Sequence, residues 1–294
     1  MPRLALGTAG FGGAYGVTKQ WCVPSLNEIG RILATAEKNN IDLLDTAIAY
    51  GNCEERLGKV GVKKFKIITK IPRIPKAENN IEKWLFYQCQ SSLKRLKIES
   101  LHGLLLHEPE QLLSFGVGEK ISKGLQLLKK RGIVKKIGIS IYCPSKLNRL
   151  SIILPLDIIQ APVNIFDQRF LNNNVVKFLK KNKVKLHCRS IFLQGLMLLP
   201  ETGLPKKFKK WENLFLAYRN FLKQNKKTAV EACVSFVRAQ PEIDRIVFGI
   251  NNRKQLIQIL KAYNNKENIP HPNLKCSDTD LILPPRWQYL KNKK

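Results

Sequence analysis

Asp42-Leu43-Leu44-Asp45-Thr46-Ala47-Ile48-Ala49-Tyr50-Gly51 is the stretch that decides the fold. It begins as a short apolar run of the length of a buried strand, and that run ends on the carboxylate of Asp45. Burying an unpaired charge costs on the order of several kcal/mol. We therefore expect Asp45 either to cap the following turn or to hold a cation.

Two further strand-like runs end on an ionisable side chain. Residues 65–70 end on Lys70, and residues 101–107 end on His107. His102 and His107 lie five positions apart on one strand, so they face opposite ways, and only one of them can point inward at the strand ends. Three successive strands with such ends predict one active site at the edge of a parallel sheet.

Strand-then-helix units continue at regular spacing along the 294 residues. This alternation favours an α/β fold of the (β/α)8 TIM-barrel type, in which function lies where strands end. A doubly wound open sheet is the alternative. Ser25 and Glu28 predict a capping box at the first helix. The strands are expected at 4–8, 43–45, 66–70, 102–107, 136–140, 157–161, 185–190 and 245–248.

The domain organisation follows from these units. We expect a single barrel over residues 1–294. An insertion after the seventh strand should span 192–227, with a helix near 211–222. The polar, proline-rich tail 264–294 is expected to lie over the barrel mouth.

Composition narrows the class of protein. The apolar fraction is 44%, enough for a large core. The sequence contains no run of about 18 apolar residues, the length that would predict a membrane span. The first apolar segment is too short for a signal peptide, so the expected location is cytoplasmic. The seven cysteines are widely spaced and form no C-x-x-C pair, which argues against a disulfide framework and a thiolate metal site.

A net charge of +29 requires its own explanation. It could reflect a nucleic-acid or acidic-lipid partner, or lysine-rich helix faces in water. Lysine pairs recur along the whole chain, and no helix-turn-helix, zinc-finger or RNA-binding signature accompanies them. This distribution favours solvated helix faces and no specific nucleic-acid partner. A basic surface would still attract a phosphorylated cofactor or substrate.

The glycine-rich loop 7–13 lacks G-x-G-x-x-G spacing, and no helix opens directly after it. A Rossmann dinucleotide fingerprint is therefore not expected, and no Walker A sequence occurs.

Tyr50, Lys70, Asp45 and His107 together would make a proton-donating site without a metal. An ammonium near a phenol favours the phenolate and lowers the tyrosine pKa, while the aspartate keeps the lysine charged. Such a site suits protonation of the alkoxide formed when hydride attacks a carbonyl, and the hydride must come from a cofactor. Each residue alone also has an ordinary interpretation, as a cap, a solvated lysine or a core histidine.

These residues and their neighbours resemble the aldo-keto reductase family. The first signature is Asp45-Thr46-Ala47 with Tyr50-Gly51, Glu54-Glu55 and Leu57-Gly58. The lysine and histidine of the family tetrad match Ile68-Thr69-Lys70 and Leu106-His107. The resemblance continues to about residue 262, through Gly138-Ile139-Ser140, Gln160 with Asn164, Arg189-Ser190 with Gln194-Gly195-Leu196, and Gly249 with Gln255.

The resemblance implies a barrel that binds NADPH, usually in preference to NADH, and reduces a carbonyl. Tyr50 would be the general acid, Asp45 and Lys70 would tune it, and His107 would orient the carbonyl. The implied cofactor residues are Gly7, Thr8, Ser140, Gln160, Arg189, Ser190, Leu193, Gln194, Gly249, Asn251, Arg253 and Gln255. Among them Ser140 and Gln160 would hold the nicotinamide carboxamide, and Arg253 is the candidate for the 2′-phosphate.

The sequence departs from the family at three places. Ile141 stands where family members often have asparagine, Arg189 where an aromatic residue often stacks on nicotinamide, and Gln258-Ile259 where a Glu-Asn pair often holds adenine. A bacterial subgroup of similar sequence is often associated with sugar or surface-polysaccharide metabolism. This association implies an aldose-like or nucleotide-sugar substrate, whereas the family as a whole implies an aldehyde, a ketone or a sugar.

Two hypotheses follow, an NADP(H)-dependent oxidoreductase and a catalytically weak barrel that binds NADP(H) as a regulatory or partner subunit. Substrate identity, reaction direction and oligomeric state are not encoded in recognisable motifs. Five loop aromatics are candidates for shaping a substrate pocket: Phe11, Trp21, Phe192, Trp211 and Trp287.

Overall fold

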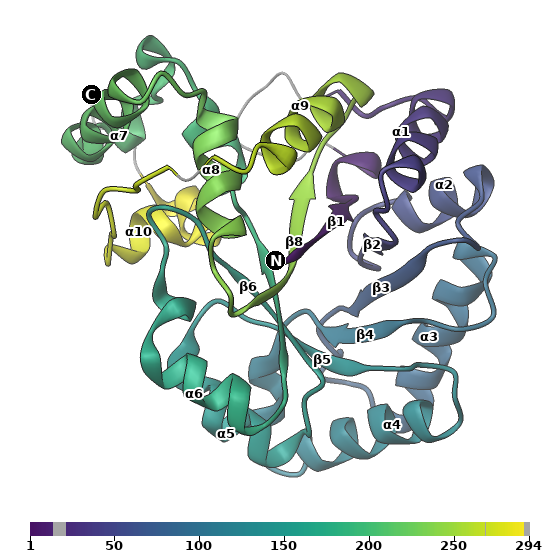
Figure 1. The fold of residues 1–294 in the computed structure, drawn as a ribbon. Helices are drawn as coiled ribbons and strands as arrows, with labels where there is room; N and C mark the ends of the chain where they lie inside the picture. The colour runs from purple at the N-terminus through teal and green to yellow at the C-terminus, as the bar shows by residue number, and fades with distance from the viewer. Residues whose placement is uncertain (14–21, 268, 291–294) are drawn as a thin grey trace.

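The computed structural model describes residues 1–13, 22–267 and 269–290. In this part of the chain eight parallel strands close into a barrel in sequence order, and β8 pairs with β1 (Figure 1). The strands are β1 (Arg3–Gly7), β2 (Leu43–Asp45), β3 (Lys66–Ile71), β4 (Gly103–Leu106), β5 (Ile137–Ser140), β6 (Ile158–Pro162), β7 (Lys185–Arg189) and β8 (Ile243–Gly249). The predicted (β/α)8 barrel is confirmed, and the open-sheet alternative is wrong.

Helices surround the barrel and connect successive strands (Figure 1). They are α1 (Leu26–Lys38), α2 (Cys53–Val60), α3 (Ile81–Leu96), α4 (Gly118–Lys130), α5 (Leu147–Ile153), α6 (Asn173–Lys181), α7 (Glu212–Gln224), α8 (Ala229–Arg238), α9 (Arg253–Asn264) and α10 (Thr279–Ile282).

The start of α1 differs in one respect from the capping box predicted for it. The Ser25 hydroxyl accepts a hydrogen bond from the Glu28 backbone N–H at 3.2 Å, as a helix cap should. The Glu28 carboxylate does not complete the box. It accepts instead from the backbone N–H of Arg253 at 2.6 Å, at the start of α9. This long-range contact ties the first helix to the helix that follows the last strand.

The strands bury two apolar layers because side chains alternate across each strand. The outer faces pack against the helices in one large core. The inner faces fill the barrel with a smaller cluster. That inner cluster consists of Ala5, Leu43, Ile68, Leu105, Ile158 and Val247. The barrel is thus a packed core whose ends, and not its centre, offer room for a site.

The segment after β7 and the C-terminal tail lie against each other. The segment contains short 3₁₀ turns, among them Lys206–Trp211, followed by α7. The Phe208 and Trp287 rings pack edge to face with centroids 5.0 Å apart, and the Trp211 indole N–H donates to Asp278 at 3.2 Å. Both tryptophans are buried by these contacts, so they join the tail to the insertion. That the tail covers the barrel mouth stays a prediction.

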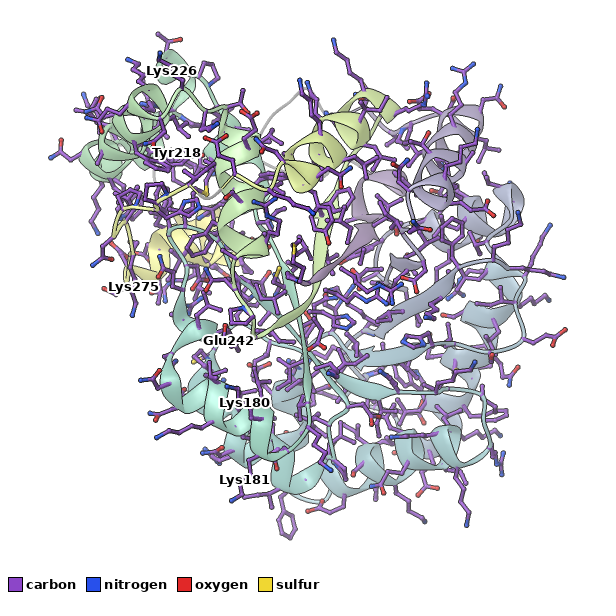
Figure 2. The ribbon with its side chains drawn as sticks, in the orientation of Figure 1. Lys180, Lys181, Tyr218, Lys226, Glu242 and Lys275 are labelled. Atoms are coloured by element: carbon purple, nitrogen blue, oxygen red, sulfur yellow. The ribbon has the colours of Figure 1, made fainter. Side chains whose placement is uncertain are left out.

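The basic side chains are spread over the surface. Figure 2 shows Lys180 and Lys181 on α6, Lys226 beyond α7 and Lys275 in the tail at separate places on the periphery. This distribution is consistent with solvated helix faces. Among the described residues, none of the helices has the length and apolar character needed to cross a membrane.

Candidate active site

The predicted site residues lie next to the inner apolar cluster, two residues further along the strands. Leu43, Ile68 and Ile158 belong to that cluster. Two residues further along each strand come the polar side chains of Asp45, Lys70 and Gln160. Because strand side chains alternate, each of these side chains also faces into the barrel, nearer its carboxyl end. The same two-residue step leads to Gly7 on β1, to Gly249 on β8 and to His107, the residue that directly follows β4.

Asp45 and Lys70 form a buried ion pair at this end of the barrel. The Lys70 ammonium lies 2.7 Å from one carboxylate oxygen of Asp45, with the lysine side chain 0% and the aspartate side chain 6% exposed. Gln160 donates to the other carboxylate oxygen at 2.6 Å. Lys70 also donates to the Thr46 carbonyl at 2.9 Å. Asp45 therefore holds a cation, one of the two roles expected for it, and both its oxygens are engaged.

Tyr50 and His107 complete the group above the ion pair. The Lys70 ammonium donates to the Tyr50 hydroxyl oxygen over a long 3.4 Å contact. The Tyr50 and His107 rings meet edge on, with centroids 5.8 Å apart. Because an ammonium has only donors, the phenol oxygen is the acceptor in this contact and its own proton stays available to another group. The structure thus brings the four predicted catalytic residues together.

The pKa of Tyr50 differs from the expectation that Lys70 lowers it. Burial raises the pKa of Tyr50 above its usual value, and the neighbouring Asp45 charge raises it further, while the Arg189 charge lowers it. Burial also lowers the pKa of His107 to about 4, with the charges of Lys70 and Arg189 acting in the same direction. At neutral pH both residues are uncharged, so the tyrosine carries a proton and the histidine can donate a hydrogen bond.

A close backbone approach fixes the loop that carries Tyr50. Gly51 has a left-handed backbone with φ of 57°, and a Cβ there would lie 2.5 Å from the Gly12 carbonyl oxygen. A Cβ on Gly12 would lie 1.8 Å from the Tyr50 carbonyl oxygen. Only glycine fits at both positions without displacement. The glycine-rich loop after β1 therefore serves to seat the Tyr50 loop.

Thr8, one of the predicted cofactor residues, contacts the backbone at Asp45. Its hydroxyl donates to the Asp45 carbonyl at 3.0 Å, and the side chain is fully buried. The Cys53 thiol contacts the Thr8 hydroxyl at 3.2 Å. Thr8 thus fixes the chain at Asp45 in this structure.

Glu54 is a buried carboxylate beside the site whose role was not recognised from sequence. It accepts hydrogen bonds from Thr69 at 2.6 Å, from Ser92 at 3.0 Å and from Arg95 at 2.8 Å. Thr69 precedes Lys70 on β3, so the network anchors that strand to α2 and α3. The sequence signal for this role was that Glu54 belongs to the family's first signature and lies one residue into a helix.

Tyr142 is a second residue missed from sequence. The Arg189 guanidinium lies over the Tyr142 ring, 4.1 Å from its centroid, and also donates to the Ser190 hydroxyl at 3.3 Å. Stacking on an aromatic face holds a guanidinium in place. Arg189 and Tyr142 both act electrostatically on Tyr50, which places them at the same end of the barrel. The spacing of Tyr142, two residues after Ser140, was the signal.

The loop after β7 has an unusual backbone at three predicted cofactor residues. Ser190, Leu193 and Gln194 have left-handed φ angles of 57°, 48° and 52°, followed by Gly195 at 90°. Non-glycine residues in this region carry strain that tends to persist at ligand sites. Two backbone N–H groups of the loop, on Leu193 and Gly195, donate to the carbonyls of Ser190 and Phe192. That this loop binds a pyrophosphate stays a prediction.

A cavity of about 300 Å³ lies between this loop and the β8–α9 segment. Four predicted cofactor residues line it: Ser190, Gln194, Gly249 and Gln255. Phe192, one of the candidate pocket aromatics, lines it as well, whereas Phe11 is fully buried and Trp21 lies outside the described residues. An apolar cavity with few polar groups is the usual form of a small-molecule site.

The side-chain oxygen of Gln160 supports a nicotinamide at this site. It is buried and accepts no hydrogen bond from the described residues, while the amide nitrogen is bound to Asp45. Leaving a buried acceptor unpaired costs about 1–3 kcal/mol. A carboxamide N–H₂ is a suitable donor for it. Ser140, the other residue predicted to hold the carboxamide, pairs in register with Gln160.

Two predicted adenosine-end residues already have protein partners. The Asn251 backbone N–H donates to the Gln255 side chain at 2.9 Å. The Arg253 guanidinium donates to the Thr35 hydroxyl of α1 at 2.9 Å, and Arg253 is not among the residues that line the cavity. Within the described residues, no group of three or more His, Cys, Asp or Glu side chains could hold a metal ion.

Comparisons with known proteins give a match at the level of family and of fold. A model of the aldo/keto reductase family matches residues 3–270. Aldo-keto reductase YhdN from Bacillus subtilis (strain 168) is 26% identical over 206 residues, which cover 66% of this chain and 60% of that protein. The match thus spans less than two thirds of that relative's length.

Solved structures show the same fold at lower identity. Aldo-keto reductase AKR11C1 from Bacillus halodurans, in its holo form, has a TM-score of 0.71 and 16% identity, covering 99% of this chain and 93% of that one. Glycerol dehydrogenase AKR11B4 from Gluconobacter oxydans has a TM-score of 0.67 and 20% identity, covering 89% of this chain and 86% of that one.

Proposed function

This chain belongs to the aldo/keto reductase family, and we propose that it interconverts a carbonyl compound and the corresponding alcohol with a nicotinamide dinucleotide as hydride carrier. The substrate class is an aldehyde, a ketone or a sugar. The observation that carries the proposal is the contact of one buried ammonium, on Lys70, with both Asp45 and Tyr50.

The proton comes from Tyr50. Its hydroxyl oxygen accepts from Lys70, so its O–H points to a different acceptor, which is the substrate oxygen. The raised pKa keeps the phenol protonated at neutral pH. As charge develops on the substrate oxygen, donation from Tyr50 neutralises it, and the adjacent ammonium stabilises the phenolate that is left.

Three further side chains, of Asp45, Gln160 and His107, hold Lys70 and the substrate oxygen in place. Asp45 and Gln160 keep the ammonium fixed and charge-balanced inside the barrel. Neutral His107, edge on to Tyr50, donates a hydrogen bond to the same substrate oxygen and orients it. In the direction of alcohol oxidation the same residues take the proton back.

The nicotinamide cofactor supplies or accepts the hydride when bound. The residues that would hold it are Gln160 and Ser140 at the carboxamide, the left-handed turn at Ser190–Gln194 at the pyrophosphate, and the cavity beside α9 at the adenosine end. The family resemblance predicts NADPH in preference to NADH, and this preference stays a prediction.

The test is Tyr50→Phe. General acid catalysis contributes roughly a hundredfold to ten-thousandfold, so carbonyl reduction should fall at least about a hundredfold. Cofactor affinity, measured by tryptophan or nicotinamide fluorescence, should stay within about twofold because the ring and its packing remain. Retention of the wild-type rate in Tyr50→Phe would remove Tyr50 from the mechanism.

A further inference from the structure

We propose that the amino-terminal end of the barrel, opposite the candidate active site, carries a second binding site, which takes a phosphate monoester. The site is a cavity of about 340 Å³ at the start of β3, β4 and β5. Three lysines and a histidine line it: Lys63, Lys66, Lys135 and His102. The carbonyl chemistry proposed above uses none of these side chains, so this inference does not depend on it.

The strand ladder fixes the basic side chains next to one another. β3, β4 and β5 are neighbours in the barrel (Figure 1). The His102 backbone N–H donates to the Ile67 carbonyl at 2.9 Å, and the Lys135 backbone N–H donates to the Leu101 carbonyl at 3.0 Å. The segments that carry Lys66, His102 and Lys135 are therefore joined by main-chain hydrogen bonds. The cluster is part of the barrel and differs in this respect from lysines along a solvated helix face.

Lys66 is only partly neutralised by its carboxylate partner. Its ammonium lies 2.8 Å from Asp42, but Asp42 also pairs with Arg3 at 2.9 Å and with Arg245 at 2.6 Å. One carboxylate thus balances three cations, and an excess of positive charge remains at this end of the barrel. The Lys66 side chain is 48% exposed, so it is accessible to a ligand.

The other two lysines of the cavity have no such partner. Within residues 1–13, 22–267 and 269–290, neither Lys63 nor Lys135 forms an ion pair with a carboxylate. Glu99 also lines the cavity, but it is exposed and forms no ion pair with either lysine. Ammonium groups gathered in this way repel one another, and a bound dianion would relieve the repulsion.

His102 adds a hydrogen-bond donor to the cavity. Burial lowers the pKa of His102 to about 4, and the charges of Lys136, Lys66, Arg245 and Lys135 act in the same direction. The imidazole is therefore neutral at pH 7, and one of its ring nitrogens is a donor. Because four cations act on this ring, an anion placed beside it would be stabilised.

The remaining lining indicates the class of ligand. Phe65, Ile67 and Ile98 form an apolar wall, and Ser100 adds a hydroxyl. A phosphate monoester has a dianionic head for the lysines and a carbon body for this wall. The cavity has the volume of a small-molecule site. A nucleic-acid backbone would instead follow an extended basic groove.

The experiment is a calorimetric titration of the whole protein with inorganic phosphate and with phenyl phosphate. Phenyl phosphate should bind about tenfold more tightly, the effect of removing roughly 55 Å² of apolar surface from water. Lys135→Gln should weaken the binding of both probes by about fivefold, the upper range for one exposed ion pair. Without ligand, Lys135→Gln should melt at the wild-type temperature or above, because the substitution removes a repulsion.

Lys183→Gln is the matched control. Lys183 is exposed and lies two residues before β7, as Lys135 lies two residues before β5, but it does not line the cavity. Its substitution should leave both affinities at the wild-type values. The chain has four histidines, so nuclear magnetic resonance of their rings locates the probe. Phenyl phosphate should shift the ring signals of His102 and leave those of His107 in place.

Several outcomes would overturn the site. These are no binding of either probe at millimolar concentration, equal weakening by Lys135→Gln and Lys183→Gln, a lower melting temperature of Lys135→Gln, or shifts of His107 in place of His102. A mixed-sequence oligonucleotide that binds more tightly than phenyl phosphate and weakens equally in both variants would also overturn it, in favour of a nucleic-acid surface. Carbonyl reduction is a separate readout, which Lys135→Gln should leave at the wild-type rate.

Discussion

Replacing Lys70 by methionine should destabilise the barrel by about 3–5 kcal/mol, the usual cost of removing one partner of a buried ion pair. The Asp45 side chain is 6% exposed and loses a 2.7 Å contact with the ammonium. The amide of Gln160 still donates to it but brings no charge. Methionine fills nearly the same volume, so the loss should come from electrostatics and not from a cavity.

Urea denaturation of single and double variants measures this directly. The double variant Asp45→Asn with Lys70→Met has no buried charge at this position, so it should recover most of the lost stability. The two substitutions would then be coupled by about 2 kcal/mol or more. Carbonyl reduction should stay lost in the double variant, because the ammonium beside Tyr50 is absent.

Lys66→Met is the control on the same strand. Lys66 pairs with Asp42 at 2.8 Å but is 48% exposed, so its loss should cost at most about 1 kcal/mol. Additive effects of the Asp45 and Lys70 substitutions, or a Lys70→Met variant as stable as Lys66→Met, would refute the reasoning from buried charge.

Two further predictions concern His187 and Gln160. Burial lowers the pKa of His187 to about 3, whereas an unfolded histidine titrates near 6.5, so the unfolded state binds the proton first and the free energy of unfolding should fall as pH drops below 6.5. His187→Gln should remove up to about 1.4 kcal/mol per pH unit of that slope in denaturation curves taken between pH 7 and 4, and an unchanged slope would contradict it. Gln160→Leu should weaken nicotinamide dinucleotide binding by roughly twofold to tenfold, the worth of one hydrogen bond, while leaving adenosine diphosphate binding unchanged in the same titration. Equal losses for both ligands would show that Gln160 acts on the fold and not on the carboxamide.

The regular strand-then-helix spacing favoured the barrel but left a doubly wound open sheet as an alternative, because both folds alternate strands and helices in this way. The position of Asp45, Lys70 and His107 at successive strand ends likewise predicted that they meet. Local pattern could not supply the hydrogen bond from Gln160 to Asp45, which joins residues 115 positions apart. The local pattern also predicted that the Glu28 carboxylate caps its own helix, whereas in the structure it accepts a hydrogen bond from Arg253 at the start of α9.

The pKa of Tyr50 was harder to predict from the sequence than the identity of the residues in the site. The expectation of a lowered Tyr50 pKa considered the ammonium alone. In the folded chain that charge is balanced by Asp45, and burial of the phenol dominates. Burial depends on how the loop after β1 closes on Gly51, which no residue type reveals by itself.

The most direct test of the central claim is a search for hydride transfer to a carbonyl carbon. Wild-type protein would be incubated with nicotinamide cofactor deuterated at the transferable position and with a panel of aldehydes, ketones and aldoses, and the alcohol products analysed by mass spectrometry. The account predicts alcohols that carry the deuterium with wild-type protein and almost none with Tyr50→Phe. Tight cofactor binding without labelled product from any member of the panel would contradict it and favour a barrel that binds the nucleotide without turnover.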